Sequence, residues 1–263
     1  MLEIPKSARH ETTRPRRRRV RFLPFLACVL AVGCTVANAA QSTQFFNGKE
    51  APLQAAIDTD DPVAIEAAVQ GGANVNAKGL HGGTPLEYAI VHFRKAAFGE
   101  LLRLKADTAL RDNDGDNAIT VATRAYAKDP DYLLMALKAG GDPNTRRHDG
   151  DPIIIRFVND LNLDAIRMMK QNGADINISD RGGDPIVVTA AISGHWDVVW
   201  CLLDLGAKFD FPERPFNMVN AFDNPKATPP DSPVFLDKVK CWKFLKAHGL
   251  KLPDLEGADQ ITN

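Results

Sequence analysis

The chain has 263 residues, 44% of them hydrophobic, with 32 lysines and arginines against 33 aspartates and glutamates. Eight of the basic residues and two of the acidic residues fall in the first 39 positions, so residues 40–263 carry 24 basic and 31 acidic residues, a net charge of −7. Because phosphate contacts need clustered lysine and arginine, this charge argues against a nucleic-acid partner and favours a partner with a basic surface.

Residues 1–39 have the three parts of a secretory signal peptide. Arginines gather between positions 14 and 21, residues 22–36 are apolar and uncharged, and Ala37-Asn38-Ala39 forms a small-residue cleavage site. The apolar run is shorter than the ~20 residues that a membrane span requires. Lipidation of Cys34 as a lipoprotein signal is the main alternative to simple cleavage, and a retained anchor is a third.

Both main alternatives export the protein, and we expect a bacterial periplasm as its location. The lipidated form would instead be an outer-membrane lipoprotein that faces the periplasm. We expect contact with a membrane only if Cys34 carries the lipid.

A repeat of about 33 residues follows the leader. Pro52, Pro85, Ala118, Pro152 and Pro185 occupy equivalent positions, with spacings of 33, 33, 34 and 33 residues. Two further features mark the unit from Asp184 to Ala207. Gly194-His195 forms a turn between two short helices, and the second helix carries an apolar stripe. The stripe consists of Val198, Val199, Leu202 and Leu203.

This pattern resembles the ankyrin repeat family, whose units run Thr-Pro-Leu-His, Ala-Ala, Gly-His, Val-Val, Leu-Leu, Gly-Ala. The resemblance implies an all-α solenoid of about five to six helix-turn-helix units with β-hairpin fingers between them. It covers residues 40–253, and residues 254–263 would form a flexible tail. The expected units lie near 51–76, 84–109, 117–144, 151–177, 184–210 and, as an atypical capping unit, 215–252.

Several residues predict local structure within the array. Thr84 and Asn117 are suited to cap first helices, and Pro62 fits the first turn of a second helix. Lys105 ends a helix where the other units have glycine, so a left-handed conformation there would cost on the order of 1 kcal/mol.

The apolar faces at the two ends of a repeat array have no neighbouring unit and must be covered by other residues. We expect Phe45 and Phe46 to cover the first end. The sixth unit contains 13 additional residues, and the role of its proline-rich insertion at 223–234 does not follow from the sequence. Its second helix should run over Phe235–His248 and present solvated lysines, namely Lys238, Lys240, Lys243 and Lys246.

Two cysteines, Cys201 and Cys241, follow the leader. An oxidising compartment is compatible with a disulfide between them, and two packed thiols are the other interpretation.

No catalytic motif occurs in the chain. The histidines after the leader lack metal-ligand spacing, and His195 belongs to the Gly-His turn. The acidic loop Asp112–Asp116 lacks the glutamate of a calcium loop, since Thr123 occupies the twelfth position, so we interpret it as a hairpin finger. We therefore expect no enzyme activity, no cofactor, no metal and no small-molecule substrate.

The resemblance implies an extended concave binding face made of finger tips and first helices. Tyr126, Arg124 and Arg147 are the favoured anchors, because aromatic and arginine side chains carry much of the energy of interfaces. Each of them is equally compatible with an ordinary solvated surface residue. The candidate positions are Leu80, His81, Val91, His92, Asn113, Asp114, Asp116, Arg124, Tyr126, Arg147, His148, Asn159, Arg181 and Ile192.

The leading functional hypothesis is an exported, non-enzymatic protein-binding scaffold, monomeric when free. By resemblance to periplasmic ankyrin proteins, it would be an immunity protein that neutralises a cognate toxin. The alternatives are a helper for a periplasmic enzyme such as a catalase, and a lipid-anchored structural protein of the envelope.

Overall fold

The computed structural model describes residues 44–214, 217–223, 228 and 232–258. The expected leader, with Cys34, and residues 259–263 of the expected tail lie outside these ranges. The described helices are η1 (Gly48–Glu50), α1 (Ala51–Asp58), α2 (Pro62–Gln70), η2 (Leu80–Gly82), α3 (Pro85–Val91), α4 (Lys95–Arg103), α5 (Ala118–Ala125), α6 (Asp131–Lys138), α7 (Ile154–Asn159), α8 (Leu163–Gln171), α9 (Ile186–Ile192), α10 (Trp196–Asp204), α11 (Met218–Asp223) and α12 (Pro233–Ala247).

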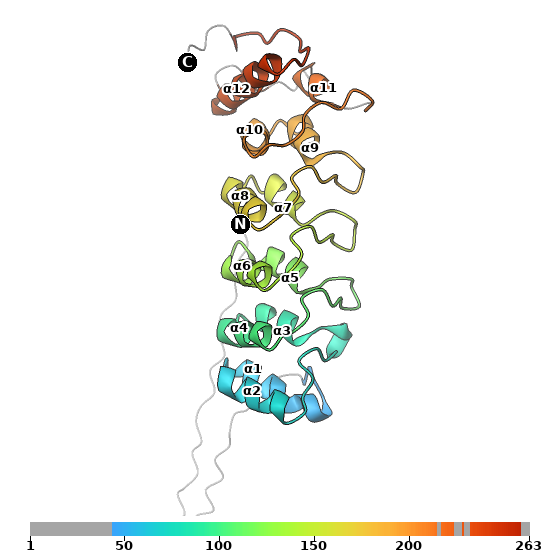
Figure 1. The fold of residues 1–263 in the computed structure, drawn as a ribbon, viewed down its shortest axis with the longest axis vertical. Helices are drawn as coiled ribbons and strands as arrows, with labels where there is room; N and C mark the ends of the chain where they lie inside the picture. The colour runs from blue at the N-terminus through green and yellow to red at the C-terminus, as the bar shows by residue number, and fades with distance from the viewer. Residues whose placement is uncertain (1–43, 215–216, 224–227, 229–231, 259–263) are drawn as a thin grey trace, which may run out of the picture. The chain divides into compact units, whose positions relative to one another are not determined.

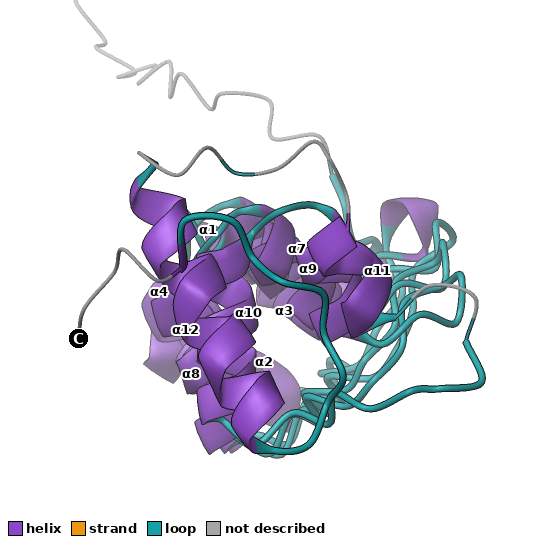
Figure 2. Cartoon of the chain, turned by 90° about the horizontal axis from the view of Figure 1, so that it is seen from above, coloured by secondary structure: helices purple, strands orange, loops and turns teal. Residues whose placement is uncertain are grey.

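The α-helices pair in chain order and the pairs stack along one axis. Figure 1 shows the first helices α3, α5, α7 and α9 beside the projecting loops, with the second helices α4, α6, α8 and α10 on the far side. Seen along the stack, the loops gather on one side of the helices (Figure 2). The arrangement confirms the predicted all-α solenoid of helix-turn-helix units.

Burial between helix pairs holds these short helices in place. The predicted stripe of the fifth unit is confirmed, since Val198 and Leu202 are 0% exposed and Leu203 is 4% exposed. Full burial of such a side chain contributes roughly 1.5–3 kcal/mol. Helices of six to nine residues are marginal alone in water, so contacts with the neighbouring units stabilise them.

The predicted caps are present at the helix starts. The Thr84 hydroxyl accepts the N–H of Glu87, whose carboxylate accepts the N–H of Thr84 in return. Asn117 and Thr120 form the same reciprocal pair on α5. Each pair satisfies amides that have no partner within the helix.

Lys105 adopts the left-handed conformation, with a φ of 64°. The equivalent residues of the neighbouring units are glycines, including Gly72 at 99° and Gly140 at 98°. A lysine Cβ is crowded in this conformation, whereas glycine tolerates it. The predicted left-handed conformation of Lys105 is therefore confirmed, and its cost in stability remains a prediction.

We expect Lys105→Gly to stabilise the protein by about 1 kcal/mol, because it removes this crowding. The measurement is the free energy of unfolding in urea. Lys138, an exposed lysine in the last turn of α6, provides the control. Lys138→Gly should destabilise by roughly 0.5–1 kcal/mol, and a shift of the same sign in both variants would contradict the explanation.

Asparagine side chains bond successive units to one another. In each case the side-chain Oδ1 accepts the backbone N–H of a residue in the next unit at an O···N distance of 2.8 Å. The acceptor and donor pairs are Asn76 with Asp107, Asn144 with Asp175, and Asn177 with Lys208. We call this set the asparagine ladder. Ala109 occupies the equivalent position of the second unit and has no side-chain acceptor, so the ladder is interrupted there.

We expect Ala109→Asn to stabilise the protein by about 1 kcal/mol, because its Oδ1 can accept the N–H of Asp142. The thermal midpoint and the urea midpoint measure the gain. Ala109→Leu has nearly the same shape without the acceptor and should give no gain. Equal stabilisation by both variants would show that packing, and not the hydrogen bond, is responsible.

Phe45 and Phe46 pack against the second unit and do not cover the outer face of the first, where a pocket between α1 and α2 stays open. Phe46 is 1% exposed, and the Phe45 ring packs 4.9 Å from the Tyr88 ring between their centroids. A Cβ on Gly79 would lie 2.5 Å from the Phe45 ring, so only glycine fits beneath it. The lead-in is thus part of the folded core.

All three tyrosines have raised pKa values, chiefly because burial disfavours the charged phenolate. The pKa of Tyr88 and that of Tyr132 rise from 10.0 to about 12. A raised folded-state pKa contributes stability that is complete below the unfolded value and is lost as the pH rises through the folded value.

We therefore expect the free energy of unfolding to fall between pH 10 and about 12. Tyrosinate absorbance should appear together with the loss of helical circular dichroism. Ionisation of all three tyrosines near their ordinary pKa, with the dichroism unchanged, would contradict this expectation.

The sixth unit differs from the expectation in one side chain. Its second helix, α12, begins at Pro233, two residues earlier than predicted. Lys238 was expected to be solvated, and this is wrong, because it is only 2% exposed. Its Nζ lies 5.3 Å from the Trp196 ring centroid and 5.7 Å from that of Phe222, and burial lowers its pKa. The two aromatic faces stabilise the cation between α10 and α11.

Cys201 and Cys241 are both buried, free thiols. The Cys241 Sγ lies 3.6 Å from the Trp196 carbonyl oxygen, to which it donates. Of the two interpretations, the structure contains packed thiols and no disulfide between these residues.

Candidate protein-binding surface

The loops between units form short hairpins, which we call the fingers. The N–H of Asp112 donates to the Asp116 carbonyl at an N···O distance of 2.7 Å. Arg147 bonds to Asp151, and Asp180 to Asp184, in the same way, both at 2.8 Å. Antiparallel bridges join Arg146 to Pro152 and Ser179 to Pro185. The predicted hairpin fingers are therefore confirmed, although each is too short to form a named strand.

The acidic finger at 112–116 is built as a turn. The Asp112 Oδ1 accepts the N–H of Asp114 at 2.9 Å and that of Asp116 at 2.8 Å. The Asp112 carboxylate therefore accepts hydrogen bonds from backbone amides of its own loop, as in an Asx turn. Over the described ranges, no three His, Cys, Asp or Glu side chains form a group that could hold a metal ion.

Basic side chains connect neighbouring fingers. In each case a side-chain nitrogen donates to a backbone carbonyl of the next finger. The pairs are Lys78 with the Arg111 carbonyl at 2.5 Å, Arg111 with the Arg146 carbonyl at 2.9 Å, and Arg146 with the Ser179 carbonyl at 3.0 Å. Charge-assisted bonds of this kind are stronger than neutral ones, so the fingers are held at a defined spacing.

The finger tips also rest on one another. Gly82 and Gly115 have positive φ values of 73° and 80°. A Cβ on Gly82 would meet Asn113 at 2.5 Å, and one on Gly115 would meet the Cβ of His148 at 3.1 Å. Each glycine therefore leaves room for the tip residue of the next finger. Because its backbone is already ordered, this surface loses little conformational freedom when it binds a partner.

Most predicted surface positions are exposed. The exposed residues are Leu80, His81, Val91, His92, Asn113, Asp114, Arg124, His148, Asn159, Arg181 and Ile192. Asp116 is a correction, because it is only 9% exposed and forms an ion pair with Arg124. Asp116 thus orients Arg124 and presents little surface of its own.

The three favoured anchors all have partners within the chain. The half-buried Tyr126 ring packs edge-on against Phe157, with 4.8 Å between the ring centroids. Arg124 pairs with Asp116, and Arg147 pairs with Asp149, whose pKa falls to about 2 because of this bond. Tyr126 therefore contributes to packing between units. The two arginines can still offer their outer N–H groups, and their contact with a partner remains a prediction.

Two exposed residues were missed by the sequence reasoning. Phe93 and Leu161 follow the first helices α3 and α7 and have left-handed backbones, with φ of 55° and 54°. They are 39% and 45% exposed. Gly194 occupies the same turn in the fifth unit, so a large apolar residue in place of that glycine was the available signal.

Five exposed apolar side chains lie on the binding side predicted from the sequence, one on a finger and four at or just after the ends of first helices. Among the described residues, seven large apolar side chains are exposed, and only Val63 and Leu236 lie elsewhere. The other five are Leu80, Val91, Phe93, Leu161 and Ile192. We call these five residues, together with the exposed tips His81, Asp114, His148 and Arg181, the finger face. Exposed apolar groups with a polar surround are typical of sites of protein association.

No protein-family model and no curated protein sequence matches the chain. Among solved structures, 385 chains are similar. One of them is the ankyrin repeat domain of Bcl-3, a member of the IkappaB protein family. It is 26% identical over 60% of this chain and 70% of that chain, with a TM-score of 0.53. The chain has the ankyrin-repeat fold.

An ankyrin-repeat solenoid exposes an extended surface on rigid units, and the fold is accordingly that of a protein-binding scaffold. In the described ankyrin units and their cap, none of the helices has the length and apolar character required to span a bilayer.

Proposed function

We propose that this ankyrin-repeat protein is exported to a bacterial periplasm and acts there, without catalytic activity, by binding one protein partner on the finger face. The observation that carries the proposal is that five of the seven exposed large apolar side chains among the described residues lie on a finger or at the ends of first helices. Such a surface can form the apolar centre of an interface with a polar rim.

The charge of the chain supports a basic partner. Residues 40–263 have a net charge of −7, and Asp114 is exposed at a finger tip. Opposite charges steer association and raise its rate. A basic antibacterial toxin neutralised by this protein would fit these properties, so we propose an immunity role, with the protein monomeric until it binds.

The test is affinity capture of the tagged protein from periplasmic extract and from cells that co-express candidate toxins. We expect one stoichiometric basic partner whose toxicity the protein suppresses. Asp114→Lys should weaken that complex about tenfold, because it reverses the charge at a tip. Asp204→Lys is the matched control, since Asp204 is an exposed acid on the second helix α10.

Other outcomes would overturn parts of the proposal. Retention of a housekeeping enzyme such as a catalase would replace the immunity role by a helper role. Membrane association that disappears in Cys34→Ala would favour a tethered envelope protein. Equal binding by the Asp114 and Asp204 variants would show that the partner does not use the finger face.

A further inference from the structure

The asparagine ladder ends at an acidic residue. Asp210 follows Asn177 by 33 residues and occupies the ladder position of the fifth unit. By the same register its donor would be the N–H of Lys251 in the sixth unit. In the described part of the chain, no group donates a hydrogen bond to the Asp210 carboxylate, and no ion pair includes it. The ladder bond between the fifth and sixth units is therefore missing.

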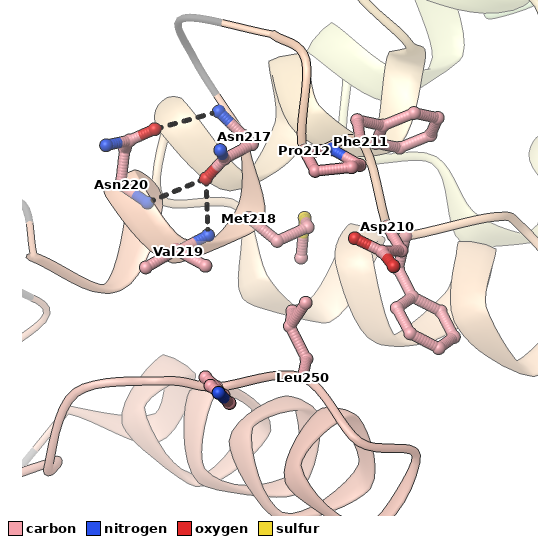
Figure 3. A pocket seen from close by; sticks show the side chains of 10 residues that line it. Asp210, Phe211, Pro212, Asn217, Met218, Val219, Asn220 and Leu250 are labelled. Atoms are coloured by element: carbon pink, nitrogen blue, oxygen red, sulfur yellow. Dashed lines mark hydrogen bonds between the residues drawn. The ribbon is translucent and has the colours of Figure 1, made fainter.

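A cavity of about 330 Å³ lies between these two units. Its walls come from the loop after α10, the start of α11 and the segment after α12. Figure 3 shows the side chains of Asp210, Met218 and Leu250 converging across it. We call this cavity the cap pocket.

The other polar side chains labelled at the pocket, Asn217 and Asn220, bond at the start of α11, and the Asn217 Nδ2 also donates to the Arg214 carbonyl at 3.5 Å. Asn217 accepts the N–H of Val219 at 3.0 Å and that of Asn220 at 3.3 Å. The Asn220 Oδ1 accepts the N–H of Asn217 at 3.1 Å. Figure 3 shows these bonds on the opposite side from Asp210. The unbonded Asp210 carboxylate is thus the charged acceptor available to a ligand in this pocket.

A carboxylate beside apolar walls selects a particular ligand chemistry. Arginine and lysine combine a cationic donor with a long apolar stem, and the stem can lie along Met218 and Leu250 while the head bonds to Asp210. The volume is at the lower end of the ~300–1,000 Å³ range of ligand sites, which suits a single side chain. Lys251 also lines the pocket, and among the described residues it forms no ion pair with Asp210.

We propose that the cap pocket binds an arginine or lysine side chain of a protein partner, with the cation on Asp210. The inference extends the proposed function, because it places a second, charge-selective contact of a basic partner at the end of the array. The pocket supplies selectivity, since a cationic side chain gains an ion pair with Asp210 that a neutral side chain cannot form.

Ligand binding in the cap pocket can be followed by nuclear magnetic resonance through the methyl group of Met218, which lines the pocket. Its methyl group can be labelled with carbon-13 together with those of Met135, Met168 and Met169, which do not line the pocket. The probe is N-acetyl-arginine amide, and its matched neutral analogue is N-acetyl-citrulline amide. We expect the Met218 signal to shift saturably with the arginine probe while the other three signals stay in place.

Asp210→Asn keeps the shape of the side chain and removes its charge. This variant should weaken binding of the arginine probe about fivefold, the upper range for a partly exposed ion pair. Asp204→Asn removes an exposed charge outside the pocket and should leave the affinity unchanged. An equal response to the citrulline probe, or unchanged affinity in Asp210→Asn, would overturn the proposal. Leu250→Ala provides a second variant, which should weaken binding of the stem without changing the charge.

The two proposals can fail separately. A partner that is lost with Asp114→Lys but bound equally by Asp210→Asn would support the finger face and reject the cap pocket. Saturable binding of the arginine probe with no captured partner would support the pocket and reject the proposed function.

Discussion

Trp196→Ala should destabilise the C-terminal end of the array by about 3–5 kcal/mol, the usual range for removing a buried large aromatic side chain. Trp196 begins α10 and is 1% exposed. Its ring lies 4.5 Å from that of Phe222 between centroids, and Lys238 lies over it. One side chain therefore joins α10, α11 and α12, and its removal leaves a cavity and a buried ammonium with only one of its two aromatic partners.

The loss should remain local. Each unit of a solenoid contacts only its neighbours, so units distant from the change keep their interfaces. We expect amide hydrogen exchange to accelerate in α10–α12 and to stay unchanged in α3–α6, with an early phase in urea unfolding. Trp200→Ala is the control, because Trp200 is half-buried and contacts Phe244 edge-on at 6.0 Å between centroids. A single transition with uniform exchange would contradict local unfolding.

Gln54→Leu should cost about 2–4 kcal/mol at the other end, because it leaves buried amides without an acceptor. The Gln54 Oε1 accepts the N–H of Phe45 at 2.8 Å and that of Phe46 at 2.9 Å. Its Nε2 donates to the Tyr88 hydroxyl at 3.2 Å, and that hydroxyl donates to Asp58 at 2.8 Å. Leucine fills the space of glutamine but replaces none of these bonds.

The thermal midpoint and limited proteolysis of the lead-in measure this effect. We expect cleavage near residues 45–47 to become faster in Gln54→Leu. Gln70→Leu is the matched control, since Gln70 is exposed at the end of α2 and its replacement should change stability by less than about 0.5 kcal/mol. Unchanged protection of the lead-in in Gln54→Leu would show that aromatic packing alone holds it.

Much of the fold could be predicted because it depends on local signals. The capping of α3 by Thr84 and the left-handed Lys105 arise from interactions within a few residues of each other. The 33-residue period repeats such local signals from unit to unit. The outward positions followed from the same period, and most of them are exposed. A sequence pattern indicates which way a residue faces.

The candidate surface was predicted less well where side chains find partners. Asp116 was expected at the surface and is buried beneath its bond to Arg124. Tyr126 was expected to be free and instead packs on Phe157 in the next unit. Such contacts depend on rotamers and on the spacing of neighbouring units, which a pattern of residue types does not specify.

The sequence by itself determined the repeat architecture, the caps and the positions of the fingers, because a period repeated across five units specifies the same local energetics each time. The tertiary structure decided how the array ends. The insertion in the sixth unit breaks the period, so spacing no longer predicts which side of α12 is covered. Only the packed helices show that Lys238 is buried and that Asp210 faces an open pocket, since both depend on how two neighbouring units meet.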